Sequence, residues 1–124
     1  MYEETGAIVA ALTTSIPEHA DSGRNWDYRY CWVRDAYYVV QALNRLGAAD
    51  MLENYLAYLR NLVDQVGSSG HVQPVYGVGL EPVLTERIAP DLPGYRGMGP
   101  VRVGNQAHEH MQYDVFGQIV LSTV

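Results

Sequence analysis

Polar and aromatic side chains alternate densely between Arg24 and Asp35, in the run Arg-Asn-Trp-Asp-Tyr-Arg-Tyr-Cys-Trp-Val-Arg-Asp. Arg34 and Asp35 are adjacent at the end of this run, where they offer a planar donor fork beside an acceptor. Such a pair suits a sugar diol, because its neighbouring hydroxyls both donate and accept hydrogen bonds. Trp32 or Tyr28 would supply the apolar face on which a sugar ring stacks.

The same cluster also has a purely structural interpretation. Asp35 directly precedes a run of helical spacing, where an aspartate commonly caps the first turn by accepting its backbone N–H groups. Arg34 would then form a surface ion pair, and the aromatic residues would anchor the core. Composition leaves both alternatives open, because the 10 Tyr and 2 Trp against 1 Phe suit wet clefts as well as helix seams.

Other reactive groups give weaker signals. His108 and His110 are two residues apart, which on a helix turns them about 200° from each other and makes a poor metal pair. Cys31 is the only cysteine, so it forms no internal disulfide, and we interpret it as a small buried apolar group. Glu81 and Glu86 lie in a loop and resemble a carboxylate pair only by proximity. We predict neither a metal nor a cofactor.

Helices must position the cluster. Apolar spacing predicts a helix over residues 2–12 and a second over 36–46, which Gly47 would end as a C′ stop. Asp50 would cap a third helix, whose apolar stripe has a period of 3.6 residues and ends at Gly67. The tight turn at Gly47 predicts an αα-hairpin of these two helices.

The stretch over residues 68–104 has a different character. It contains most of the chain's 12 glycines and five of its 6 prolines, which predicts loop with short extended pieces. This stretch also contains large aromatic and charged residues, which a solvated linker would lack, namely Tyr76, Tyr95, Arg96 and Arg102. Long loops in compact domains are commonly functional. Helical spacing returns over residues 106–124, and we expect that helix to be cut at the end of the chain.

Bulk properties restrict the partners. The 124 residues suffice for one domain, and the net charge of −6 argues against nucleic acid and anionic membranes. Apolar runs are too short for a membrane span, and the N-terminus lacks the pattern of a signal peptide. We therefore expect a cytoplasmic location.

The run from Arg24 to Asp35 resembles the signature of glycoside hydrolase family 15, which contains glucoamylases, glucodextranases and trehalases. The resemblance covers essentially the whole chain and is most specific in the W-x-R-D and P-V-R-x-G-N blocks. The further segments in the family's order are 5–11, 13–18, 72–77, 94–97, 100–105 and 112–117.

The resemblance implies an all-α fold, in which residues 1–124 form part of an (α/α)6 barrel of helical hairpins with long connecting loops. Arg34 and Asp35 would bind hydroxyls of the glucose unit at the non-reducing end, and Tyr28 and Trp32 would line the same subsite. A second loop would bring Arg102 and Asn105 to the cleft. Asp114 also falls in the family's order and would orient its neighbours. The ligand would be an α-linked oligosaccharide or disaccharide.

Members of this family hydrolyse α-glucosides with inversion, which requires a general acid and a general base. The family's acid lies in a W-E-x-R-type segment, and no such segment occurs in this chain. We therefore predict a glucoamylase-like chain without catalytic residues that carries part of a sugar-binding subsite and associates with itself through apolar helix faces. The alternative is a non-catalytic sugar-binding or scaffold module.

Overall fold

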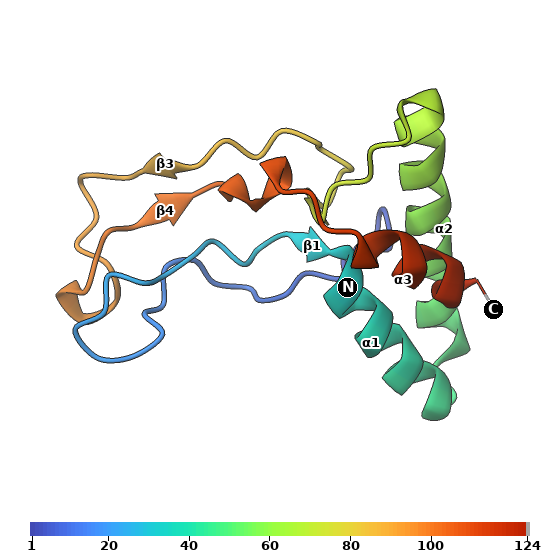
Figure 1. Cartoon of the computed structure of the whole chain (residues 1–124). Coiled ribbons are helices and arrows are strands. Elements are labelled where there is room, and N and C mark those ends of the chain that lie inside the picture. Colours follow the sequence, from blue (N-terminus) through green and yellow to red (C-terminus); the bar gives the residue numbers. More distant parts are fainter. Residues whose placement is uncertain (124) are drawn as a thin grey trace.

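Three helices gather at one end of the molecule, and a long arm of extended chain forms the other end (Figure 1). This computed structural model describes residues 1–123. The helices are α1 (Val33–Arg45), α2 (Ala49–Val66) and α3 (Asp114–Ser122). The regular secondary structure is therefore mostly helical, as predicted, while the (α/α)6 barrel stays a prediction. None of the helices over residues 1–123 is long and apolar enough to cross a bilayer.

The predicted αα-hairpin is confirmed, because α1 and α2 contact each other across a short turn. Gly47 has a φ of +77° in that turn, and its N–H donates to the carbonyl of Asn44 at 3.0 Å. Only glycine adopts this conformation without steric cost, which is why α1 ends there. Gly67, with a φ of +53°, ends α2 as predicted. α1 also contacts α3, so it lies between the other two helices.

The predicted aspartate caps are wrong. The N-cap residues of α1 and α2 are Trp32 and Ala48, and Asp35 and Asp50 lie inside the first turns. Helix α1 begins early because its first N–H, that of Val33, donates at 3.1 Å to the carbonyl of Pro74. A neighbouring backbone segment thus satisfies a donor that a capping side chain would otherwise take.

The core lies where α1, α2 and α3 meet the first residues of the arm. Its buried members are Ala7, Cys31, Val33, Ala36, Val40, Tyr55, Tyr58, Leu59, Leu62, Val72, Tyr76 and Val115. The hydroxyl of Tyr58 donates to the carbonyl of Gly77 at 3.0 Å, so a buried polar tip is satisfied. Burial raises the pKa of the Cys31 thiol to about 11, in keeping with its interpretation as a buried apolar group.

The predicted helix over residues 2–12 is wrong, because this segment runs extended beyond a turn at residues 3–5. Gly6 has a φ of +82°, and a Cβ there would collide with the backbone carbonyl of Asn54 in α2. The N–H groups of Ala10 and Ala11 donate to the carbonyls of Tyr30 and Tyr28, at 3.0 and 2.9 Å. Pairing with a distant segment has overridden the local helical spacing.

The arm consists of two irregular hairpins that lie side by side. The first pairs residues 10–18 with residues 24–30, through bonds such as Ser15 N–H to the Trp26 carbonyl at 2.9 Å. The second pairs β3 (Arg87–Ile88) with β4 (Arg102–Val103), antiparallel. A further short pair, β1 (Cys31–Trp32) with β2 (Val75–Tyr76), joins the arm to the helices.

The long loop is as predicted, with short extended pieces and 3₁₀ turns at Gly67–Ser69 and Tyr95–Gly97. The prediction of one helix over residues 106–124 is confirmed only in part. A 3₁₀ turn at Gln106–Glu109 is followed by an irregular stretch, and α3 begins at Asp114. Val124, the last residue of the predicted helix, lies outside the described residues.

Candidate functional site

A cleft of about 610 Å³ lies where the N-terminus of α1 meets the arm. Five of the six side chains predicted to bind a sugar line this cleft, and the sixth, Arg102, contacts two of the lining residues, Glu86 and Trp26. Their role in sugar binding stays a prediction. The lining residues are Ala10, Trp26, Tyr28, Trp32, Arg34, Asp35, Glu86, Asn105, Gln106, Ala107 and His110.

The aromatic wall comes from the extended run that leads into α1. The rings of Tyr28 and Trp32 lie 5.7 Å apart at an interplanar angle of 51°. A tilted pair at this distance is a favourable aromatic contact, so each ring holds the other in place. Ordered aromatic faces of this kind suit the apolar C–H face of a pyranose.

The charged end of the cleft is the first turn of α1. The Nη2 atom of Arg34 lies 3.3 Å from Oδ2 of Asp35, and its Nη1 lies 3.6 Å from Oδ2 of Asp114 on α3. All three side chains are between 41% and 53% exposed, so solvent or a ligand can reach them. One guanidinium thus sits between two carboxylates at long distances, which leaves hydrogen-bonding capacity free on each group. Asp114, which was expected to orient its neighbours, therefore contacts Arg34, one of the predicted site residues.

The opposite end of the cleft contains a tighter pair. Nη1 of Arg102 lies 2.6 Å from Oε1 of Glu86, and both side chains are at most one-fifth exposed. The guanidinium carbon of Arg102 is 5.2 Å from the centroid of the Trp26 ring, within cation–π range. The indole N–H of Trp26 donates to Glu18 at 3.2 Å. These two contacts hold the Trp26 ring in place, one through its N–H edge and the other through one of its two faces.

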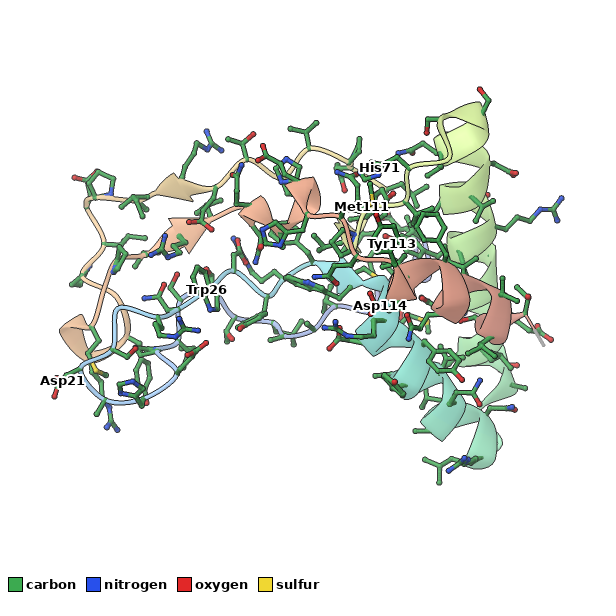
Figure 2. All side chains as sticks on the ribbon, viewed as in Figure 1. Asp21, Trp26, His71, Met111, Tyr113 and Asp114 are labelled. Atoms are coloured by element: carbon green, nitrogen blue, oxygen red, sulfur yellow. The ribbon has the colours of Figure 1, made fainter. Side chains whose placement is uncertain are left out.

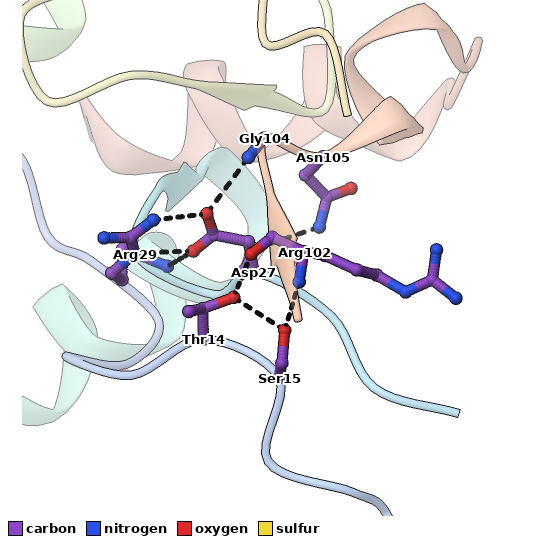
Figure 3. A network of polar contacts seen from close by, with 7 residues as sticks. All are labelled: Thr14, Ser15, Asp27, Arg29, Arg102, Gly104 and Asn105. Carbon is purple, nitrogen blue, oxygen red and sulfur yellow. Dashed lines mark hydrogen bonds and ion pairs between the residues drawn. The ribbon is translucent and has the colours of Figure 1, made fainter. Parts of the chain in front are cut away.

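A buried carboxylate joins the two walls (Figure 3). Asp27 is fully buried and accepts Nε and Nη2 of Arg29 at 2.8 and 2.7 Å, and the N–H of Gly104 at 3.1 Å. The side-chain amide of Asn105 donates to the carbonyl of Asp27 at 3.0 Å. Burial raises the pKa of Asp27, but the hydrogen bonds from Arg29 and Gly104 outweigh it and hold the pKa below its usual value. The carboxylate is therefore charged at neutral pH.

A second link lies beside the first. The hydroxyl of Thr14 donates to the carbonyl of Arg102 at 2.6 Å, and the hydroxyl of Ser15 accepts the N–H of Arg102 at 2.7 Å. Gly104 has a φ of +89°, and a Cβ there would collide with the carbonyl of Thr85. The two strands of the second hairpin therefore approach each other at Gly104 as closely as backbone allows, and the hydrogen bonds of residues 102, 104 and 105 fix that hairpin to the first one.

The two loop glutamates do not form a pair. Glu86 lines the cleft, whereas Glu81 folds back and accepts the N–H of Gly79 at 2.9 Å. The two histidines also separate: Nδ1 of buried His108 lies 3.0 Å from the carbonyl of Asn105, and His110 lines the cleft. Among residues 1–123, no group of three or more His, Cys, Asp or Glu side chains is placed to hold a metal ion.

Sequence reasoning missed Trp26, Glu86 and His110 as lining residues. Trp26 belongs to the dense polar-aromatic run, so its position in that run was the available signal. Glu86 lies 16 residues from its partner Arg102 in a glycine-rich and proline-rich loop, where no periodicity indicates pairing.

Curated relatives match nearly the whole chain. It is 41% identical over 121 residues to a trehalase of Thermoplasma volcanium, 39% over 120 residues to a trehalase of Mycobacterium tuberculosis, and 39% over 117 residues to trehalase 2 of Sulfolobus acidocaldarius. These alignments cover 96%, 96% and 94% of this chain, but only 18% to 20% of the relatives. The chain therefore spans about a fifth of their length. No solved structure gives a significant match.

The sequence model of glycosyl hydrolases family 15 matches residues 1–124. The match includes the segments that line the cleft and the buried link between its walls. The chain belongs to glycosyl hydrolase family 15.

Proposed function

We propose that this chain supplies part of the glucose-binding subsite of an α-glucoside hydrolase that acts on a disaccharide, with trehalose as the first candidate. The observation that carries the proposal is the convergence of Arg34, Asp35, Tyr28, Trp32 and Asn105 on one cleft. Trehalose is favoured over starch-like glucosides because the relatives described above are named trehalases.

The side chains of the cleft have the hydrogen-bonding capacity that a hexose needs. Arg34 offers several donors and Asp35 several acceptors, and both are partly exposed. Asn105 uses its Oδ1 to accept the N–H of Ala107 at 3.0 Å and one amide N–H to reach the Asp27 carbonyl. One amide N–H and one lone pair of Asn105 remain for a hydroxyl.

Hydrolysis with inversion requires an acid and a base about 6.5–9.5 Å apart, with room for a water molecule between them. The two carboxylates that line the cleft are Asp35 and Glu86, and an arginine pairs with each. We therefore assign neither of them the role of acid or base. We propose that the catalytic pair belongs to parts of the enzyme outside these residues, because the relatives are about five times longer.

The same difference in length supports the (α/α)6 barrel as the parent architecture. Large apolar side chains are exposed on all three helices, for example Tyr38 at 60% on α1 and Val120 at 61% on α3. Exposed apolar side chains on a helix commonly mark an interface when they gather on one face. We propose that the isolated chain associates with itself through these faces, which light scattering tests directly. A cytoplasmic location stays a prediction.

The binding proposal is tested with the purified chain and trehalose, by titration calorimetry. We expect binding without turnover, and loss of binding in Arg34→Ala. The matched control is Arg45→Ala, at the other end of the same helix and outside the cleft. Equal affinity in both variants, or the absence of any binding by the unmodified chain, would remove the proposal.

A further inference from the structure

An apolar groove of about 440 Å³ lies between α2 and α3, and none of its lining residues belongs to the cleft described above. Figure 2 shows these helices at the end of the molecule opposite the tip of the arm, with side chains that project outward from both. The apolar lining includes Leu56, Leu59, Val63 and Ile119, and the two charged residues of the groove are Arg60 and Asp64.

Arg60 and Asp64 are both exposed and lie about one turn apart on α2. Residues four positions apart share one face of a helix and are about 6 Å apart along its axis. Within residues 1–123, neither Arg60 nor Asp64 forms an ion pair. A basic residue that precedes an acidic one is also the less favourable order for a pair within one helix. Both charges are therefore available to a binding partner.

We propose that this groove is the docking surface for a second copy of the chain, with α2 antiparallel to α2 of that copy about a two-fold axis level with Leu62. Arg60 of each copy then faces Asp64 of the other, so the dimer contains two equivalent ion pairs. This inference rests on the self-association proposed above, and it specifies which surface is used and in which orientation.

The order of the charges selects a second copy as the occupant. In a two-fold interface the same surface meets itself, so that residue i contacts residue j and residue j contacts residue i. An antiparallel helix reverses the order of Arg60 and Asp64 and thus sets opposite charges against each other. A parallel helix in the same register would instead set Arg60 against Arg60.

Apolar burial and charge would have separate roles in this dimer. Val63 is 43% exposed and lies one residue from the level of the axis, so a second copy would cover it. Burial of such apolar surface supplies affinity. Charge pairs at the rim of an interface contribute mainly to orientation and to the choice of partner.

Charge reversal tests the arrangement. Arg60→Glu places a carboxylate opposite Asp64 of the second copy, and Asp64→Arg places a guanidinium opposite Arg60. We expect each variant alone to raise the dissociation constant of the dimer at least about tenfold, because opposed like charges in an interface are strongly unfavourable. An equimolar mixture of the two variants should associate again, since both contacts then join opposite charges.

Sedimentation equilibrium measures these dissociation constants, and circular dichroism checks that each variant folds. The matched control is Arg87→Glu, which changes the charge equally but lies on β3, outside the groove. It should leave the dissociation constant unchanged. Arg60→Gln removes the charge without reversing it and should raise the constant only about two- to tenfold, which provides a milder test if a reversal disturbs folding.

The outcomes separate this surface from the other proposals. If the unmodified chain is monomeric at all concentrations, both the surface and the self-association are wrong. If the chain associates and neither reversal weakens it, this surface is wrong and another apolar face is used. If the mixture fails to restore association, the antiparallel two-fold arrangement is wrong. Sugar binding is measured separately by calorimetry, and its loss in the unmodified chain would leave the surface unaffected.

Discussion

Two arginine–aspartate pairs lie close together in the sequence, with their arginines almost equally exposed, at 44% and 42%, but their carboxylates in opposite environments. In the pair of Arg29 with Asp27, the carboxylate is fully buried, and two guanidinium nitrogens reach it at 2.7 and 2.8 Å. In the pair of Arg34 with Asp35, the carboxylate is 53% exposed and one contact reaches it at 3.3 Å. Protein donors satisfy the first pair, whereas the second retains capacity for a ligand. The same two residue types thus have a structural role in one place and line the candidate site in the other. We call the contacts of Asp27 that join the two hairpins the frame.

The energetic consequences of removing each pair should differ as strongly. Removing the buried carboxylate of the first pair leaves the Gly104 N–H without its acceptor and breaks charge-assisted bonds to the 44% exposed Arg29, which costs up to about 3 kcal/mol. An exposed pair contributes about 0.2–1 kcal/mol, because water competes for both charges. Substitutions in the two pairs therefore test the distinction between frame and site directly.

We expect the largest effect from Asp27→Ala. It removes the acceptor of Arg29 and of the Gly104 N–H, so the free energy of unfolding should fall by up to about 3 kcal/mol. Urea denaturation measures this loss, with Asp91→Ala in an exposed turn as the control. A midpoint equal to that of the control would show that Asp27 is not part of the frame.

Gly104→Ala should have the next largest effect. Its φ of +89° strains a side-chain-bearing residue, and the added methyl group meets the carbonyl of Thr85. Strain of this kind costs about 1–3 kcal/mol. The control is Gly23→Ala, where a Cβ meets no atom and φ is not positive. Comparable melting temperatures for the two variants would contradict the close approach of the two strands of the second hairpin at Gly104.

A change of pH should have a smaller and gradual effect on the stability that Asp27 contributes. The pKa of Asp27 is lower in the folded chain than its usual value of about 3.9, so its stabilising contribution is present above that value and is lost as the pH falls through the folded pKa. The stability gap between the unmodified chain and Asp27→Asn should therefore narrow below about pH 4. Denaturation midpoints of both proteins across the acid range measure it. A gap that stays constant down to acid unfolding would assign the titration to other groups.

The smallest effect on stability should come from Asp35→Asn, at under about 1 kcal/mol, because the pair is exposed and does not cap α1. Affinity for trehalose should nevertheless fall about ten- to hundredfold, since a charge-assisted hydrogen bond is worth about 1.5–3 kcal/mol. Calorimetry and thermal melting on the same sample separate the two. An affinity that falls only in proportion to stability would make Asp35 part of the frame.

The parts of the fold that depend on local rules were predictable. The stops at Gly47 and Gly67 depend on neighbours within a few residues, and both are confirmed. The apolar stripes of α1 and α2 are confirmed in most of their positions, although Val39 and Val63 are exposed. The segment over residues 2–12 has helical spacing too, yet its backbone donors pair with Tyr28 and Tyr30 about twenty residues away. Local periodicity cannot report a partner at that distance.

The residues of the candidate site also differ in whether local sequence alone could identify them. Tyr28, Trp32, Arg34 and Asp35 were identified because they are contiguous with the signature. Glu86 and the supporting position of Arg102 depend on a pairing across a long loop, which only the three-dimensional arrangement displays. The buried state of Asp27 was likewise invisible, because an aspartate in a polar run gives no sign of burial.

The bond between Gly104 and Asp27 spans 77 residues and has a consequence for the order of folding. The α1–α2 hairpin closes through neighbours in sequence, whereas the walls of the cleft meet only after a long loop has lost its conformational entropy. We expect core substitutions such as Leu62→Ala to slow refolding, and Gly104→Ala mainly to accelerate unfolding, which stopped-flow kinetics distinguishes. During synthesis, the ribosome would release a complete helical hairpin well before it releases the residues that close the cleft.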